Sequence, residues 1–447
     1  MALPCKGESV IGSFVIRGTV AGLVVAGFSA LPMQTSTAAQ PLATSPVVNV
    51  WSEPASGYGF IDSAIASART SVDLSMYELS DVTIEHELIA RAGAGVDVRV
   101  LLNADYGGTS HNADSYALLH ASKVHVEWAP ADRIFHAKYL IVDGRAAYIG
   151  TGNLETIDYP STRDFWVEDV RTADVTAVER TFDEDFARSF STAQAAGLVW
   201  SPGSESTLVS LIGSAKRTLL VENEEMDSSG IEAALRSAAR RGVSVKVVMT
   251  ESSSWTSALV NLVRSGVHVR VLSSTQVYIH AKVICVDCID GTGTVFIGSE
   301  NFSTSSLSYN RELGVITTAP TAVLAVDRAV SADFAAGTTV AAPRTTTPPT
   351  VTGAGGAVTV TSFITAISPG EEDSLSVHSS KPDDSCDLEV TLPSGYTSES
   401  HGLGVTRANA VGNVTWTWKI GTGTGPGTAR ATVTCGAGRA LRDFVIR

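Results

Sequence analysis

Two short segments of the chain carry the same reactive side chains: a histidine, a lysine two residues later and an aspartate five residues after the lysine. The two copies are His136, Lys138 and Asp143, and His280, Lys282 and Asp287. Both lie in apolar runs that predict strands, so the imidazole and ammonium of each copy project from one face. An imidazole can act as a nucleophile or as a general acid and base, and an ammonium can stabilise negative charge. Five residues is an odd step along a strand, so each aspartate lies on the face opposite to the histidine and lysine. We therefore infer a structural role for the aspartates.

Each copy is followed by further polar residues at matching positions. The first continues with Gly150, Thr151, Gly152 and Asn153, and the second with Gly298, Ser299, Glu300 and Asn301. A carboxylate comes next in both, since Asp164 lies 28 residues after His136 and Glu312 lies 32 residues after His280. The difference of four residues matches the greater length of the second hairpin, so the two carboxylates are equivalent. A carboxylate there can orient a histidine through its Nδ1 proton.

The motifs belong to an internal duplication in which corresponding residues are offset by about 144 to 148 positions. A helix that leads into a strand is predicted at residues 60–74 and again at 208–222. A second strand is predicted at residues 95–102 and again at 242–249. Strands that alternate with helices predict an α/β sheet covered by helices on both faces. We therefore predict two α/β halves, residues 40–195 and 196–340, related by a pseudo-twofold axis, with a site at their seam.

The duplicated His-x-Lys-x4-Asp motif and its Gly-Thr/Ser-x-Asn continuation resemble the phospholipase D superfamily across residues 45–338. The resemblance implies two halves that each contribute one motif to a single site. It also implies that one imidazole attacks phosphorus to form a phosphohistidine while the other protonates the leaving alcohol. It makes His136 the nucleophile and His280 the acid and base, an order that the residues themselves leave open. The six motif residues would be catalytic, and the supporting or phosphate-binding residues would be Asn153, Asn301, Thr151, Ser299, Asp164 and Glu312.

No metal or other cofactor is expected. The two lysines supply the positive charge that a metal would otherwise provide, and the sequence holds no acidic cluster at metal spacing. We therefore expect an activity that survives chelators. Cys285 and Cys288 have Cys-x-x-Cys spacing, but no second Cys or His pair follows at zinc spacing. Buried thiols or a local disulfide are favoured there over a redox or zinc site.

The ends of the chain differ in composition from its middle. Residues 1–39 combine two basic residues, an apolar stretch at 18–31 and small residues up to Ala39, which is typical of a secretory signal peptide. An uncleaved anchor is the alternative. The signal predicts a secreted or cell-surface protein in an oxidising compartment.

Residues 341–357 are rich in Pro, Thr, Gly and Ala, which is typical of a linker. Residues 358–447 contain short alternating runs that predict a β-sandwich domain of immunoglobulin-like type. Cys386 and Cys435 lie in or beside such runs, and we expect a disulfide between them.

The charge balance bears on the substrate. The chain has 32 Lys and Arg against 46 Asp and Glu, and residues 40–343 alone have 22 against 36. This acidity disfavours proteins that bind by neutralising many phosphates, and it disfavours adsorption to anionic membranes. A phospholipid at a membrane or micelle surface is therefore favoured over nucleic acid as the substrate. Among phospholipids, a zwitterionic one is favoured.

Three classes of function remain open. We favour a phospholipase D that hydrolyses a glycerophospholipid to phosphatidic acid and the free head-group alcohol. A secreted endonuclease of the same superfamily and a noncatalytic binding protein are the alternatives. We expect a monomer with an internal pseudo-dimer. Four aromatic residues near the first motif could form an apolar rim for lipid: Trp128, Tyr139, Tyr159 and Trp166. Three glutamates could also approach the site: Glu155, Glu222 and Glu300.

Overall fold

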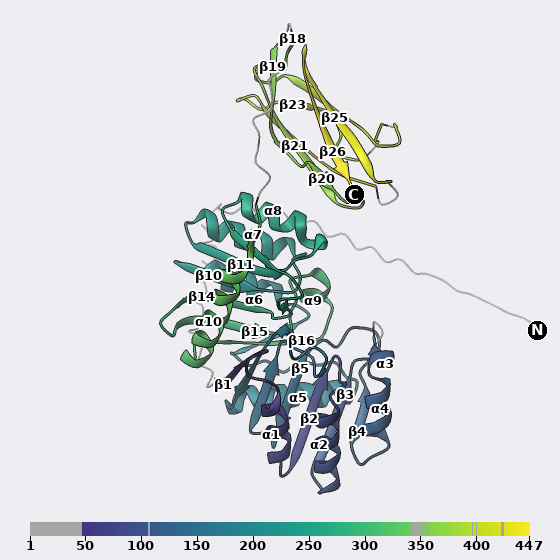
Figure 1. Ribbon diagram of the computed structural model, residues 1–447, viewed down its shortest axis with the longest axis vertical. Helices are drawn as coiled ribbons and strands as arrows, with labels where there is room; N and C mark the ends of the chain where they lie inside the picture. Colours follow the sequence, from purple (N-terminus) through teal and green to yellow (C-terminus); the bar gives the residue numbers. More distant parts are fainter. Residues whose placement is uncertain are drawn as a thin grey trace, which may run out of the picture. The chain divides into compact units, whose positions relative to one another are not determined.

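The computed structural model describes residues 47–105, 108–341, 351–353, 356–395, 397–398, 400–421 and 424–447. The predicted signal peptide and most of the predicted linker lie outside the described residues. The described residues form an α/β region of two similar halves, followed by an all-β region, which confirms the predicted fold class (Figure 1). No helix in this part of the chain is long and apolar enough to cross a membrane.

The first half is built on a mixed seven-stranded sheet with the strand order β1-β8-β6-β5-β2-β3-β4. Its strands are β1 (Val47–Ser52), β2 (Ser71–Met76), β3 (Asp97–Leu102), β4 (His125–Trp128), β5 (Lys138–Val142), β6 (Ala146–Gly150) and β8 (Phe165–Asp169). Its helices are α1 (Gly59–Ser67), α2 (Val82–Gly93), α3 (Gly108–His111), α4 (Ala113–His120) and α5 (Thr172–Phe186). Strands β2, β3 and β4 run parallel, while β5 runs antiparallel to β2.

Alternation along β5 shows how helices cover both faces of this sheet. Leu140 and Val142 pack in the core beneath α1 and α2, whereas Tyr139 and Ile141 pack in the core that contains α5. Successive side chains of a strand point to opposite faces. The apolar run that contains the first lysine is therefore buried on both sides.

The second half repeats this arrangement on an eight-stranded sheet with the order β17-β12-β11-β10-β14-β15-β16-β9. Its strands are β9 (Leu198–Ser201), β10 (Thr218–Glu222), β11 (Ser244–Thr250), β12 (His268–Leu272), β14 (Val283–Ile289), β15 (Thr292–Gly298), β16 (Glu312–Thr317) and β17 (Thr338–Thr339). Its helices are α6 (Glu205–Ser214), α7 (Ser229–Arg240), η1 (Ser253–Trp255), α8 (Thr256–Arg264), α9 (Thr304–Ser308) and α10 (Pro320–Ala336). Apart from β17, the strands follow the order of the first half, as the duplication in sequence predicts.

Local sequence explains why the repeated helices begin and end where they do. Helix α2 is capped by Asp81, whose carboxylate accepts the backbone N–H of Thr83 at 2.9 Å, and Ser228 caps α7 in the same way. Both helices lead into a turn at a glycine with positive φ, 92° at Gly95 and 90° at Gly242. Glycine adopts that conformation at little cost, so the chain reverses directly into β3 and β11.

The halves share one apolar core, which contains α5, α10 and the facing sides of the two sheets. At the seam, β7 (Thr162–Arg163) pairs in parallel with β13 (Tyr278–Ile279). Two buried ion pairs cross the seam, Arg163 with Asp333 at 2.6 Å and Arg311 with Asp185 at 2.7 Å. The relative placement of the two halves is thus fixed by backbone pairing, apolar packing and charge.

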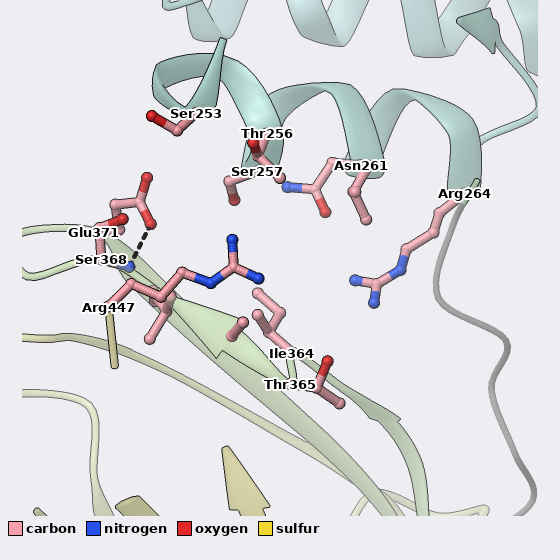
Figure 2. A pocket seen from close by; sticks show the side chains of 13 residues that line it. Ser253, Thr256, Ser257, Asn261, Arg264, Ile364, Thr365, Ser368, Glu371 and Arg447 are labelled. Atoms are coloured by element: carbon pink, nitrogen blue, oxygen red, sulfur yellow. Dashed lines mark hydrogen bonds between the residues drawn. The ribbon is translucent and has the colours of Figure 1, made fainter. Parts of the chain in front are cut away.

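The all-β region contains two sheets, with the orders β18-β19-β21-β24 and β20-β26-β25-β22-β23. The strands are β18 (Val351–Gly353), β19 (Gly356–Phe363), β20 (Ala366–Ile367), β21 (Glu372–Ser379), β22 (Ser385–Thr391), β23 (Gly404–Arg407), β24 (Asn413–Lys419), β25 (Gly427–Cys435) and β26 (Gly438–Ile446). Val414, Trp416 and Trp418 alternate with exposed residues along β24 and pack in the core of this region. In the turn before β21, the Ser368 backbone N–H donates to Glu371 Oε2 at 2.8 Å (Figure 2).

The predicted disulfide between Cys386 and Cys435 is present. The two cysteines are directly paired residues of β22 and β25. The bond therefore joins neighbouring strands of one sheet, whereas antibody domains link their two sheets.

Candidate active site

Both motif histidines lie at the seam, where each comes shortly before a strand. His136 precedes β5, and His280 precedes β14. The backbone N–H of His136 donates to the carbonyl of Arg311 at 2.9 Å, and that of His280 donates to the carbonyl of Arg163 at 3.2 Å. The backbone of each histidine is thus held by the opposite half.

The imidazole rings are also held by the opposite half. His136 Nδ1 lies 2.8 Å from Glu312 Oε2, and His280 Nδ1 lies 3.0 Å from Asp164 Oδ1. Burial alone would raise the pKa of both carboxyls, but the neighbouring histidines outweigh burial and lower it. Each carboxylate therefore remains ionised and accepts the Nδ1 proton, which leaves Nε2 for chemistry.

The orienting carboxylates have hydrogen-bond donors of their own. Glu312 Oε1 accepts from Ser306 Oγ at 2.7 Å and from Asn310 Nδ2 at 3.0 Å. Asp164 Oδ1 accepts from Thr151 Oγ1 at 2.6 Å. These donors fix the rotamer of each carboxylate and hence the plane of each imidazole.

The surroundings of the first motif favour the neutral forms of His136 and Lys138. Burial, opposed by Glu312, lowers the pKa of His136, so this imidazole is neutral at pH 7. Lys138 and Lys282 are fully buried, and each donates to the backbone carbonyl of its own motif histidine. Burial and the nearby Lys282 ammonium lower the pKa of Lys138 to about 7.

The two asparagines lie beside the motifs. Asn153 Nδ2 donates to Glu78 Oε2 at 2.9 Å, and Asn301 Nδ2 donates to Glu224 Oε2 at 3.2 Å. Their Oδ1 atoms are buried and have no hydrogen-bond partner among the residues that the structure describes. Each amide nitrogen is thus held by a carboxylate of its own half.

Thr151 and Ser299, which the sequence predicts as supporting or phosphate-binding residues, lie in supporting positions. Both residues are fully buried. Thr151 Oγ1 donates to Asp164, and Ser299 Oγ accepts the backbone N–H of Leu313 at 3.0 Å. The two hydroxyls therefore position the carboxylate-bearing segments and do not face the site.

Comparison with known proteins identifies the family. A family model described as "Cardiolipin synthase, PLD-like domain" matches residues 61–186 and 208–334. The chain belongs to this PLD-like family. It is a phosphodiester-acting enzyme of the phospholipase D superfamily, as the duplicated motif predicts. A comparison with curated proteins gives no match.

Solved structures share the fold. Phosphatidylserine synthase of Haemophilus influenzae is 11% identical, with a TM-score of 0.52, over 66% of this chain and 89% of that one. Polyphosphate kinase of Porphyromonas gingivalis is 16% identical, with a TM-score of 0.51, over 64% of this chain and 50% of that one. The PLD-like chain thus matches only half the length of the kinase.

The motif aspartates of this PLD-like chain do not belong to the catalytic group, so their assignment as catalytic is corrected. Asp143 accepts the backbone N–H groups of residues 69–71 at 2.7–3.1 Å, and Asp287 accepts those of residues 216–218 at 2.7–3.3 Å. Both have positive φ, 53° and 51°. They tie the turn after the motif strand to the start of the neighbouring strand, which is the structural role inferred from their spacing.

Sequence reasoning missed two residues that touch the motifs. Glu224 Oε2 lies 3.1 Å from Lys282 Nζ and 3.6 Å from His280 Nε2. The Tyr77 ring lies 4.7 Å from the His136 ring, and Lys138 Nζ lies 4.8 Å from the centroid of the Tyr77 ring. Tyr77 follows β2, and Glu224 follows the equivalent strand β10. The sequence signal that could have found them is the end of the strand that is repeated at residues 71–76 and 218–222.

The three glutamates considered from sequence have different surroundings. Burial and the nearby Glu78 raise the pKa of Glu155 to about 7, and Glu155 Oε2 lies 3.5 Å from Asn153 Nδ2. Burial raises the pKa of Glu300 well above its usual range, and Glu312 raises it further. Glu222 is fully buried near Asp333 and Arg163. Glu222 and Glu300 are therefore core residues, whereas Glu155 is half-buried.

The Cys-x-x-Cys segment forms a local disulfide between Cys285 and Cys288. Both cysteines are buried in or beside β14. Within the described ranges, no three His, Cys, Asp or Glu side chains form a group that could hold a metal ion.

Proposed function

We propose that the protein is a phospholipase D that hydrolyses a zwitterionic glycerophospholipid to phosphatidic acid and the free head-group alcohol. The observation that carries this proposal is the pair of histidines, each oriented through Nδ1 by a carboxylate of the other half. Such a pair supplies the nucleophile and the acid that a two-step phosphoryl transfer requires.

In the first step, the neutral Nε2 of His136 attacks phosphorus, and the P–N bond forms as the bond from phosphorus to the head-group oxygen breaks. His280 donates its Nε2 proton to that oxygen. Lys138, Lys282 and the two site asparagines hold the non-bridging oxygens. In the second step, His280 takes a proton from water, the water oxygen bonds to phosphorus, and the P–N bond breaks.

Acidic groups around His280 support a cationic leaving group. Asp158 lies near enough to His280, Glu78 and Glu224 for their charges to influence its pKa, which burial raises overall. Carboxylates at this side of the site attract an ammonium head group. They would repel the phosphates that flank the scissile bond of a nucleic acid, which favours lipid over the endonuclease alternative.

The four aromatic residues predicted from sequence do not form an apolar rim. Tyr139 and Trp166 are fully buried, and Tyr159 and Trp128 are stacked on neighbouring rings. Two other residues are exposed in the segments that follow the site asparagines, Ile157 at 81% and Tyr309 at 66%. One exposed apolar side chain in each half, close in sequence to the site asparagine, suits contact with a lipid surface.

The test compares lipid and nucleic acid directly. The purified protein is incubated in EDTA with phosphatidylcholine vesicles and, separately, with single- and double-stranded DNA, with His136→Ala as the control. We expect choline and phosphatidic acid from the wild type only. DNA cleavage without lipid turnover would identify the endonuclease instead, and loss of activity in EDTA that an added cation restores would contradict the metal-free mechanism. Added ethanol or glycerol, which gives a new phosphodiester in a transferase, separates transfer from hydrolysis.

We also propose that the protein works outside the reducing cytosol. The two disulfides, Cys285–Cys288 and Cys386–Cys435, support this location because such bonds persist in oxidising compartments. Recovery of the active protein from the culture medium, with an N-terminus near Ala39, is the expected result. Retention of all active protein in the cytosol would contradict it.

A further inference from the structure

Glu224 lies two residues beyond β10, with its carboxylate among the donors that the proposed mechanism assigns to phosphate. Its Oε2 atom lies 3.1 Å from Lys282 Nζ, accepts a hydrogen bond from Asn301 Nδ2 at 3.2 Å, and lies 3.6 Å from His280 Nε2. A non-bridging oxygen of a phosphodiester would use the same lysine and asparagine donors. The carboxylate oxygen therefore stands where a phosphate oxygen would bind.

The two halves differ in the residue at the position of Glu224, although each site asparagine donates to a carboxylate of its own half, Asn153 to Glu78 and Asn301 to Glu224. Ser71 and Thr218 are equivalent, because each donates its backbone N–H to the motif aspartate of its half. Six residues further along the chain lie Tyr77 and Glu224, respectively. An aromatic ring therefore contacts the first His-Lys pair, while a carboxylate contacts the second. This difference breaks the pseudo-symmetry at the groups that bind phosphate.

The Glu224 side chain is partly open to solvent. It is 22% exposed, whereas the orienting carboxylates of Glu312 and Asp164 are 0% and 3% exposed. Its other oxygen, Oε1, accepts from Tyr278 OH at 2.8 Å, on β13 at the seam. Burial alone would raise the pKa of Glu224, but Lys282 and His280 lower it well below its usual range. The group is therefore an ionised carboxylate that a bound phosphate must displace.

We propose that Glu224 determines specificity by charge, so that the site prefers a singly charged phosphodiester to a doubly charged phosphomonoester. This inference rests on the proposed phosphodiester hydrolysis. The displaced carboxylate stays close to the phosphoryl group and repels it in proportion to its charge. A phosphodiester carries one negative charge, whereas a phosphomonoester carries nearly two at neutral pH because its second pKa is about 6. The product, phosphatidic acid, is a monoester, so Glu224 promotes its release.

The test measures anion binding without turnover. Inorganic phosphate, as the dianion, and dimethyl phosphate, as the monoanion, are titrated at pH 8 into wild type and Glu224→Gln by calorimetry. Removal of the charge should tighten phosphate binding by about tenfold or more and dimethyl phosphate binding by a smaller factor. Failure of the variant to bind phosphate more tightly than wild type, or an equal gain for both ligands, would overturn the proposal.

A matched control separates this effect from net charge. Glu251→Gln makes the same chemical change at an exposed residue directly after β11 of the same half, and its affinity for both anions should equal that of wild type. A similar gain in this control would show that total charge, not the position of Glu224, is responsible.

The binding result is independent of the substrate assignment. If Glu224→Gln binds phosphate more tightly but wild type turns over no lipid, the proposed role of Glu224 at the anion site is supported and the phospholipase assignment is wrong. Lipid turnover by wild type without the gain in phosphate affinity would keep the phospholipase and reject the role of Glu224.

Discussion

His136 Nδ1 of the first half lies 2.8 Å from the Glu312 carboxylate of the second half. The reciprocal contact joins His280 to Asp164. Each half therefore supplies the carboxylate that orients the histidine of the other half, and neither histidine would be oriented if its half stood alone. The neighbouring histidines and the hydrogen bonds outweigh burial and keep both carboxylates ionised, so each imidazole keeps its Nδ1 proton and presents Nε2.

Replacement of Glu312 by Gln should lower kcat by about 10²–10⁴-fold, because the amide can stabilise the wrong tautomer of His136 and cannot stabilise its positive charge. Steady-state turnover of phosphatidylcholine measures the effect. The matched control is Glu300→Gln, which replaces a buried carboxyl whose raised pKa already keeps it neutral. This control should retain activity within about threefold. Equal losses in both variants would contradict the orienting role of Glu312.

The pH dependence of kcat/KM should be bell-shaped, with its maximum near neutral pH. His136 must be neutral to attack, and burial lowers its pKa below the usual imidazole value, so activity is kept on the acid side until the pH falls below that value. Lys138 must be protonated to hold phosphate, and its pKa is about 7, so activity falls as the pH rises through that value. Lys138→Arg keeps its charge and should shift the alkaline fall upward. A wild-type profile that stays flat up to pH 9 would rule out this role for Lys138.

Asp143→Ala should destabilise the protein by about 2–4 kcal/mol, because three backbone N–H groups lose their acceptor and alanine disfavours positive φ. Urea unfolding measures the loss. At urea concentrations below the unfolding midpoint, the activity of the variant should differ from that of wild type by only a few-fold. A thousandfold loss of kcat at unchanged stability would instead return Asp143 to the catalytic group.

The same carboxyl gives a pH signature. Although burial raises the pKa of Asp143, its hydrogen bonds lower it to about 2. A lowered folded-state pKa stabilises the protein above the unfolded value of about 4, and this contribution disappears as the pH falls through 2. Asp143→Asn tolerates positive φ but cannot titrate, so it should lose this part of the acid sensitivity. Identical acid unfolding curves for the two proteins would refute the assignment.

The two disulfides should differ in their effect on stability. Cys386 and Cys435 are 49 residues apart, whereas Cys285 and Cys288 are three apart. The loop-entropy model gives losses of about 4 and about 1.5 kcal/mol, respectively, when each pair is replaced by alanine. Denaturant unfolding of the two double variants provides the comparison. A larger loss for the short loop would show that packing around β14, and not chain entropy, dominates.

The sequence predicted the repeated α/β halves because apolar periodicity and the duplicated motif are local patterns. It also predicted Asp164 and Glu312 as orienting groups, because their spacing from the histidines repeats. The exchange of carboxylates between halves was not predictable, since it depends on the pairing of β7 with β13 across the seam.

Side chains whose role depends on packing were harder to assign. The sequence left open whether Thr151 is a supporting or a phosphate-binding residue, and only packing shows that its hydroxyl is directed to Asp164. Tyr139 looked like a rim residue, but it lies on the α5 side of a strand buried on both faces. Glu224 has no motif around it, and only the fold brings it to Lys282.

The most direct test of the mechanism uses His280→Ala and a phosphatidyl ester of 4-nitrophenol. This leaving group needs no acid, so His136 can still attack, but water is not activated without His280. We predict a burst of about one equivalent of nitrophenol per chain and a phosphatidyl adduct on the His136 peptide by mass spectrometry, with neither in His136→Ala. An adduct on His280 in the His136→Ala variant, or no burst in His280→Ala, would contradict the assignment of His136 as the nucleophile.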